Sequence, residues 1–435
     1  MRPSRFLLRQ LLYDFASGLL GRPALWIGTL AVTAMVLPPL ELRYAPELSS
    51  FLATEPSSAQ VVLGTLAGSM MSVIGVVYST LLVALSLASM QFSTRILAGM
   101  TRDRVAQDTL GMFIGTFVYC LLVLRAVRSE PAPSVPGIAY AGALLLALTA
   151  LGHLVYFIHH IVQSIQANHL IARIGNETAL VIDAVFSIPL PGGEMAVDAE
   201  VPAVPTGAAM VLARSSGYVQ LIDIDGLQAI AARGASVHLL KPMGAFVAEG
   251  LPLLAIQPPP SAADQDAAVA AIDIGAIRTM QQDVEFGIRQ IVDIALKAVS
   301  PAVNDPSTAV TCVDHLGRLL VQLAQRNPLP ALHGDGVVVP QTTHGDLIDL
   351  CFEQLRQYTR TDMAVSLRIM RVLGEVASVT RHEGARRRLA LHARLIDEAM
   401  RAAFAPEDCE ELGRRRAVLD AHIAPTTTAE PGGRP

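Results

Sequence analysis

The stretch VVLGTLAGSMMSVIGVVYSTLLVALSLASM, residues 61–90, decides the fold of this chain. It contains apolar, small and hydroxyl side chains and no charged one. A helix that crosses the hydrocarbon core of a bilayer needs about 20 predominantly apolar residues. At about 1.5 Å per residue the stretch spans about 45 Å, so it predicts one membrane helix that tilts or projects beyond the bilayer.

Three further segments, at 24–42, 108–127 and 137–163, are also long and apolar enough to cross a bilayer. Arginines precede the first segment and lie between the second and the third, whereas the first extramembrane loop is mainly acidic. The positive-inside rule therefore places both termini in the cytoplasm. We expect a multi-pass protein of the bacterial plasma (inner) membrane that contacts the lipid bilayer.

The composition agrees with a membrane domain followed by soluble parts. Of the 435 residues, 52% are hydrophobic and 16% are charged, whereas charged residues average about 25% in soluble domains. The apolar excess lies almost entirely before residue 165, which predicts a four-helix transmembrane domain at 1–165. The net charge of -5 argues against a nucleic-acid-binding protein.

The predicted fold class is four transmembrane α-helices followed by a cytoplasmic α+β region. Residues 166–206 are expected to form a helical extension and a linker, and 207–260 a small β-rich module that resembles a barrel-sandwich. A cytoplasmic helical domain follows at 261–420, with a disordered tail at 421–435.

Within these parts the pattern predicts individual elements. The expected strands are 209–213, 217–222, 236–240 and 251–256, with a short helix at 225–233. The expected helices of the last domain are 277–299, 306–326, 344–356, 361–379 and 383–403.

Small and hydroxyl residues recur along the second membrane segment. They are Gly64, Gly68, Ser72, Ser79 and Ser86. The third segment carries a further GxxxG pair, Gly111 and Gly115. In lipid, small residues let helices approach closely, and hydroxyls can bond across the interface. Two interpretations stay open for the second segment: helix packing, within one bundle or between protomers, and the lining of a polar path with Ser72, Ser79 and Ser86.

Histidines lie in the second half of the fourth segment. His153, Tyr156, His160 and Gln163 recur at three- and four-residue steps and form one stripe, and His159 lies beside it. Ionisable side chains at membrane depth are functional candidates by default. No carboxylate is expected nearby. The stripe is therefore interpreted as interhelix hydrogen bonding or, alternatively, as a proton- or ion-handling site near the inner mouth of a path; metal ligation comes third, and no metal site is assigned.

The loop between the second and third segments is basic. Arg95, Arg102 and Arg104 are expected at the inner interface, where they would meet anionic lipid head groups or the cytoplasmic domain. A dedicated ligand site in this loop is the second interpretation.

KAVSPAVNDPSTAV, residues 297–310, predicts a corner between two helices. Pro301 disfavours helical geometry at the residue before it, and Asp305 followed by Pro306 is a strong helix-start signal. The alternative is a cytoplasmic contact site built from Asn304, Asp305, Ser307 and Thr308, in which the free N–H groups of Ser307 and Thr308, with Asn304, would bind an anion or a partner. A capping Asp305 works against the anion.

No motif predicts catalysis. The cysteines, Cys120, Cys312, Cys351 and Cys409, form no CxxC pair, so neither a disulfide framework nor a zinc site is predicted. There is no nucleophile–base pair and no phosphate loop. We expect that the protein is not an enzyme and needs no cofactor.

Four stretches of the chain together resemble a known family. They are GVVYSTLLVALSLASMQFSTRIL, LGMFIGTFVYCLLVLRAV, YFIHHIVQSIQ and QDVEFGIRQIVDIALKAVSPAVNDPSTAV. The resemblance covers roughly residues 10–400 and is to an uncharacterised bacterial family of predicted membrane proteins, the domain of unknown function 2254. It implies an inner-membrane protein with four helices and a cytoplasmic C-terminal region, and it implies no mechanism.

Two functional hypotheses follow. The first is a channel- or transporter-like homo-oligomer for an ion or small solute, with a cytoplasmic domain that assembles or gates the pore. The second is a membrane-anchored cytoplasmic binding, scaffold or sensor protein without transport activity.

Overall fold

The computed structural model describes residues 21–91, 103–128, 134–164, 166–186, 202–327, 330, 332–333 and 336–423. The chain divides into two compact units, Met1–His169 and Leu170–Pro435. Each unit has its own packing and is considered by itself.

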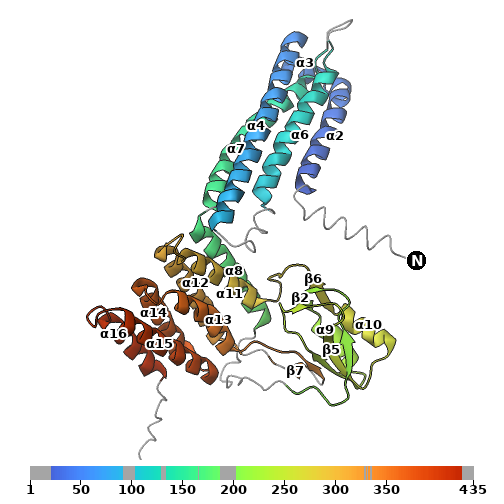
Figure 1. Ribbon diagram of the computed structural model, residues 1–435. Helices are drawn as coiled ribbons and strands as arrows, with labels where there is room; N and C mark the ends of the chain where they lie inside the picture. The colour runs from blue at the N-terminus through green and yellow to red at the C-terminus, as the bar shows by residue number, and fades with distance from the viewer. Residues whose placement is uncertain are drawn as a thin grey trace, which may run out of the picture. The chain divides into compact units, whose positions relative to one another are not determined.

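The first unit is a bundle of long apolar helices (Figure 1). Its helices are α2 (Gly21–Tyr44), α3 (Pro46–Leu52), α4 (Pro56–Gln91), α6 (Arg104–Ala126) and α7 (Gly137–Ser164). All except the short α3 are long and apolar enough to cross a membrane. The prediction of four apolar helices near the N-terminus is thereby confirmed.

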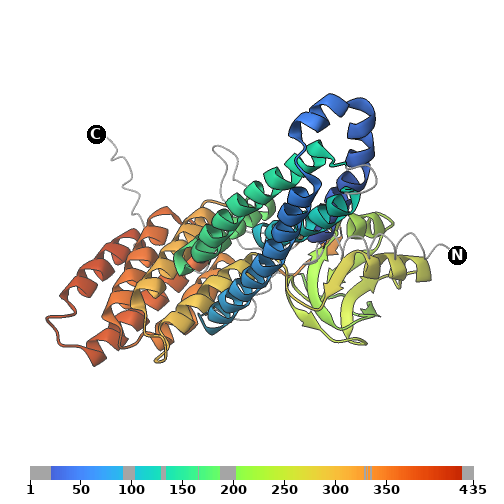
Figure 2. The ribbon, with the colours of Figure 1, turned by 90° about the horizontal axis from the view of Figure 1, so that it is seen from above.

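α6 is the central helix of this bundle. It contacts α2, α4 and α7, and α4 and α7 lie side by side in two perpendicular views (Figures 1 and 2). The GxxxG pair of α6 lies in the α2 contact, because a Cβ atom added at Gly111 would come within 2.8 Å of Pro23 Cα, and one at Gly115 within 2.7 Å of Leu30 Cδ1. These two glycines therefore serve close packing within one chain.

The start of α7 is capped by the preceding helices. The buried carboxylate of Glu41 accepts a hydrogen bond from the backbone N–H of Ala139 at 3.0 Å. The Ser49 hydroxyl accepts one from the N–H of Gly137 at 3.1 Å. These bonds satisfy two of the four N–H groups that a helix leaves without an internal partner.

The second unit contains most of α8 (Ala167–Val185) and a set of packed helices. The helices are α11 (Val284–Ala298), α12 (Pro306–Ala324), α13 (His344–Tyr358), α14 (Met363–Val379), α15 (Glu383–Ala403) and α16 (Glu410–Ile423). The first begins at Val284, seven residues later than its expected start at 277, because the Asp283 side chain caps it there. α16 was not expected as a helix, because it is largely polar and buries only Leu412 and Leu419.

The β-rich part of this unit forms two sheets around one core. Its strands are β1 (Ala209–Leu212), β2 (Gly217–Ile222), β3 (Ser236–Leu239), β4 (Phe246–Val247), β5 (Pro252–Gln257), β6 (Ile272–Gly275), β7 (Leu332–His333) and β8 (Val337–Val338). The orders are β1-β5-β3-β8-β7 and β4-β2-β6, with β3 and β8 parallel and the other pairs antiparallel. Two short helices accompany them, α9 (Ile224–Ala231) and α10 (Ala262–Ala270).

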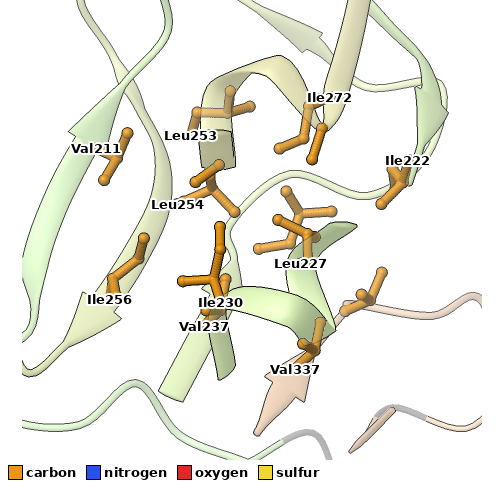
Figure 3. Packing of buried hydrophobic residues seen from close by; sticks show 14 of the residues in the cluster. Val211, Ile222, Leu227, Ile230, Val237, Leu253, Leu254, Ile256, Ile272 and Val337 are labelled. Carbon is orange, nitrogen blue, oxygen red and sulfur yellow. The ribbon is translucent and has the colours of Figure 1, made fainter. Parts of the chain in front are cut away.

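Three of these strands come from outside the expected module at 207–260. Ile272 of β6 and Val337 of β8 enter the same apolar core as Leu227, Leu254 and Ile256 (Figure 3). The two sheets are therefore complete only when strands from the expected helical domain pair with those of the module. The barrel-sandwich resemblance stays a prediction.

Candidate functional site

A network of charged and aromatic side chains lies in the bundle near the start of α6. Asp108 accepts two hydrogen bonds from the Arg22 guanidinium of α2, from Nε at 2.8 Å and from Nη2 at 2.7 Å. It accepts a third from Nε1 of Trp26 at 3.2 Å. Bidentate pairing of this kind is stronger and more directional than a single ionic contact. Asp108 thus ties the first turns of α2 to those of α6.

A second carboxylate near the start of α6 binds the histidine stripe. Asp103 caps α6 by accepting from the N–H of Ala106 at 3.0 Å, and its other oxygen accepts from His160 Nε2 of α7 at 2.7 Å. The expectation that no carboxylate stands near the histidines is therefore wrong. It failed because Asp103 is distant in sequence and is brought to α7 by helix packing.

The aromatic rings of the stripe contact one another along α7, with His153 edge-on to Tyr156 and Tyr156 stacked on His160. The ring centroids of His153 and Tyr156 are 6.0 Å apart, and those of Tyr156 and His160 are 6.2 Å apart. His153 also lies within electrostatic range of Asp108, and the exposed His159 hydrogen-bonds Gln163 at 2.9 Å. The stripe is thus part of a polar cluster that joins α2, α6 and α7, which we call the inner cluster: Arg22, Trp26, Asp103, Asp108, His153, Tyr156 and His160.

The serines of the second membrane segment lie elsewhere. Ser72, Ser79 and Ser86 are all exposed on the outer face of α4. The Ser72 hydroxyl donates to the carbonyl of Gly68 in its own helix at 3.1 Å. The buried face of α4 instead joins apolar clusters that fill the space between the four helices, with Leu63, Ala67, Met70, Val77 and Ala84. In a single chain these serines therefore do not line an interior path.

The structure describes only part of the basic loop. Arg104 is the first residue of α6 and is exposed. Arg95 and Arg102 lie outside the described residues. Their contact with lipid head groups stays a prediction.

The corner between α11 and α12 forms as the helix-stop and helix-start signals predict. Asp305 caps α12: one carboxylate oxygen accepts from the Thr308 N–H at 3.1 Å and the other from the Thr308 hydroxyl at 2.6 Å. These hydrogen bonds lower the pKa of Asp305. Asn304 and Ser307 are exposed, and Asn304 has a φ of 50°, a left-handed conformation that asparagine tolerates better than most residues. The N–H groups that an anion would need are occupied by Asp305.

Sequence reasoning missed the acidic half of the inner cluster, although two signals pointed to it. Asp103 stands directly before an apolar run, where a helix N-cap is expected. Asp108 is a carboxylate inside a membrane-length segment, and such a residue is rare unless it is paired. Its partner Arg22 could not be inferred, because it depends on which helices pack together.

The family that this chain matches is one of predicted membrane proteins, in agreement with its four membrane-length helices. The family model described as predicted membrane protein (DUF2254) matches residues 16–375. An uncharacterized protein of Mycobacterium tuberculosis is 30% identical over 427 residues, which is 94% of this chain and 80% of the relative, and an uncharacterized protein of Mycobacterium bovis matches to the same extent. No solved structure matches this chain significantly. The chain therefore belongs to the DUF2254 family of predicted membrane proteins, as its four apolar helices and the resemblance of its sequence lead one to expect.

Proposed function

We propose that the protein is a channel- or transporter-like homo-oligomer of the bacterial inner membrane, in which α4 of each copy faces α4 of another. Any path for an ion or small solute then runs between copies, and the cytoplasmic unit assembles or gates it. The proposal assigns no enzymatic reaction to the chain. The observation that carries it is the composition of the exposed face of α4.

Small residues recur along one exposed side of this helix, which also carries the exposed side chains of Val61 and Leu82. The members of what we call the small face are Gly64, Gly68, Ser72, Gly75, Ser79 and Ser86. Their spacings of three, four and seven residues keep them on one side of an α-helix. All are exposed, and a Cβ atom added at Gly64, Gly68 or Gly75 would meet nothing within 4 Å.

The two sets of glycines therefore differ in their partners. Gly111 and Gly115 of α6 are in close contact with α2 of the same chain, whereas the small face of α4 has no such contact within the described residues. In lipid, small faces are characteristic of helix–helix interfaces because they let backbones approach. In this proposal the small face packs against α4 of a second copy of the chain.

The inner cluster supplies the charge that a gate would need. Asp103, Asp108 and Arg22 lie at or near the ends of membrane-length helices, where ionisable groups are costly unless they pair or serve a pathway. In this proposal the hydrogen bond between His160 and Asp103 lies near the inner mouth of the path. The two side chains transfer a proton there or change hydrogen-bond partners.

The packed interior of the bundle favours a second candidate function. Apolar clusters fill the space between the helices of one copy, and the Ser72 hydroxyl is already bonded within α4. A membrane-anchored cytoplasmic binding, scaffold or sensor protein would need no more than this.

The test uses full-length protein in lipid nanodiscs and in proteoliposomes. We expect native mass spectrometry to find an oligomer for the wild type and for Val76→Leu, an exposed α4 position outside the small face. We expect Gly68→Leu to dissociate it, because the added side chain blocks close approach. Flux of K⁺ or H⁺ across proteoliposomes should follow the oligomer. A monomeric wild type would overturn the proposal, whereas an intact oligomer without flux at any tested pH or voltage would leave the anchored binding protein.

A further inference from the structure

A cavity of about 260 Å³ lies inside the second unit. Its walls come from five separated segments: the end of α8, the β2–α9 connection, the turn before β4, the start of α11 and the segment between β7 and α13. Because these segments are up to about 160 residues apart in sequence, no local sequence motif predicts the cavity. Its volume lies just below the range of about 300–1,000 Å³ that is usual for drug-sized ligands.

The cavity is lined by both apolar and polar side chains. Phe186, Ile222, Met243 and Leu347 are among the apolar ones. Asp283, Glu285, His333 and Thr342 are among the polar lining residues. A mostly apolar wall with a few convergent polar groups is the usual make-up of a small-molecule site.

At this cavity there are more acidic side chains than basic ones. Asp283 is 3% exposed and accepts two hydrogen bonds from Arg278, from Nε and Nη2, each at 2.8 Å. The same guanidinium is 3.7 Å from Glu285, which otherwise accepts from the Thr342 hydroxyl. One cation thus serves two carboxylates, and no Lys or Arg is among the described residues that line the cavity. The site carries a net charge of about -1 when both acids are ionised.

This arrangement disfavours an anionic ligand. The start of α11 lies in the cavity wall, and Asp283 already accepts from its Phe286 N–H at 2.9 Å. The carboxylate occupies the position in which a phosphate or carboxylate ligand would bind. Burial lowers the pKa of His333, so this side chain adds no positive charge near pH 7.

A metal ion is also disfavoured. Within the part of the chain that the structure describes, no three His, Cys, Asp or Glu side chains are grouped so that they could hold one. A ligand with its own apolar surface would contact the apolar lining residues, which a bare ion would leave without a partner.

We infer that this cavity binds a small organic monocation, an amine with an apolar body, and that Glu285 is its counter-ion. The ammonium group donates hydrogen bonds to Glu285, and the body contacts Phe186, Met243 and Leu347. The inference concerns the second unit alone and holds whether or not the protein conducts ions.

The test compares ligands that share a body and differ in head group. Full-length protein in nanodiscs is titrated with 2-phenylethylammonium, 2-phenylethanol and phenylacetate, with cyclohexylammonium as a second cation. Saturation-transfer NMR reports binding, and empty nanodiscs provide the background. We expect the ammonium probes to bind about ten-fold or more tightly than the alcohol and the carboxylate, because a hydrogen bond to a charged group is worth about 1.5–3 kcal/mol.

Three variants locate the binding. Glu285→Gln should weaken ammonium binding by about ten-fold or more and remove the preference over the alcohol. Met243→Trp should abolish binding of every probe by filling the cavity, and Glu249→Gln, an exposed acid of the same unit, should change nothing. Thermal unfolding verifies that each variant is folded. Equal affinities for the three head groups, unchanged ammonium binding in folded Glu285→Gln, or no saturable binding of either cation by the wild type would overturn the inference.

Discussion

At the scale of single residues, His344 shows how burial sets a charge state in the second unit. Its ring is buried, stacks on His382 with centroids 4.0 Å apart, and contacts Phe186 edge-on at 6.1 Å. Its Nε2 donates to the Leu323 carbonyl near the end of α12 at 2.9 Å. Burial, with a smaller contribution from His382, lowers the pKa of His344 from 6.5 to about 4. The imidazole is therefore neutral in the folded protein.

This lowered pKa predicts that acid destabilises the second unit. Between pH 6.5 and about 4 the unfolded chain binds a proton at residue 344 that the folded chain does not, so the free energy of unfolding falls as the pH falls. The full effect of this one group is about 3 kcal/mol. Chemical unfolding at pH 7 and pH 4.5 measures it. His344→Phe should flatten the pH dependence, although it lowers stability at pH 7 by about 1–3 kcal/mol because the Leu323 carbonyl loses its donor.

The control for this experiment is His169→Phe, at an exposed histidine. It should keep the slope of the wild type. If His344→Phe loses stability with acid as steeply as the wild type does, then other groups carry the dependence.

Residue-level inference from sequence succeeded where the partner was local. The capping role of Asp305 follows from its position before Pro306, and its acceptors bind Thr308 three residues on. It failed where the partner was distant, because the Asp103–His160 and Asp108–Arg22 pairs join residues 57 and 86 positions apart. Those pairs depend on the packing of helices, which periodicity alone does not determine.

At the scale of elements, one glycine controls how closely α2 and α6 approach. A Cβ atom at Gly111 would lie 2.8 Å from the backbone Cα of Pro23 and 2.9 Å from Trp26 Cδ1. The backbone cannot give way as a side-chain tip can, so the two helices must separate.

Gly111→Ala is therefore expected to destabilise the bundle by about 1–3 kcal/mol, the usual cost of overpacking. Separation of α2 from α6 would also strain the hydrogen bonds of Asp108 with Arg22 and Trp26. Gly152→Ala on α7 is the matched control, because a Cβ atom there meets nothing within 4 Å. Thermal unfolding in detergent compares the two. Equal stability of both variants would contradict the close α2–α6 contact.

The strands show the limit of element prediction. β1, β2, β3 and β5 each contain a recognisable apolar run, and each lies within a residue of its expected bounds. β7 and β8 are two residues long and were not expected, because such short strands carry too little pattern to be distinguished from loop. They become strands by pairing, β8 with β3 and β7 with β8.

At the scale of the whole molecule, the four membrane-length helices were predictable because lipid imposes length and hydropathy on each helix separately. The partner of the small face was not predictable, because a face of glycines and serines is compatible with a neighbour in the same chain or in another copy. The cavity of the second unit was not predictable either, because its walls meet only after folding.

The orientation of the chain in the membrane is the last prediction. The distribution of arginines predicts that both termini lie in the cytoplasm, in which case α3 faces the periplasm and the second unit faces the cytoplasm. The four native cysteines are buried, so single added cysteines at exposed positions can report the side of the membrane. Glu47 of α3 and Ser307 of α12 are exposed. A membrane-impermeant maleimide should label Glu47→Cys in intact spheroplasts, and it should label Ser307→Cys only after lysis. Labelling of Ser307→Cys in intact spheroplasts, with Glu47→Cys protected until lysis, would reverse the orientation and move the inner cluster to the outer side of the membrane.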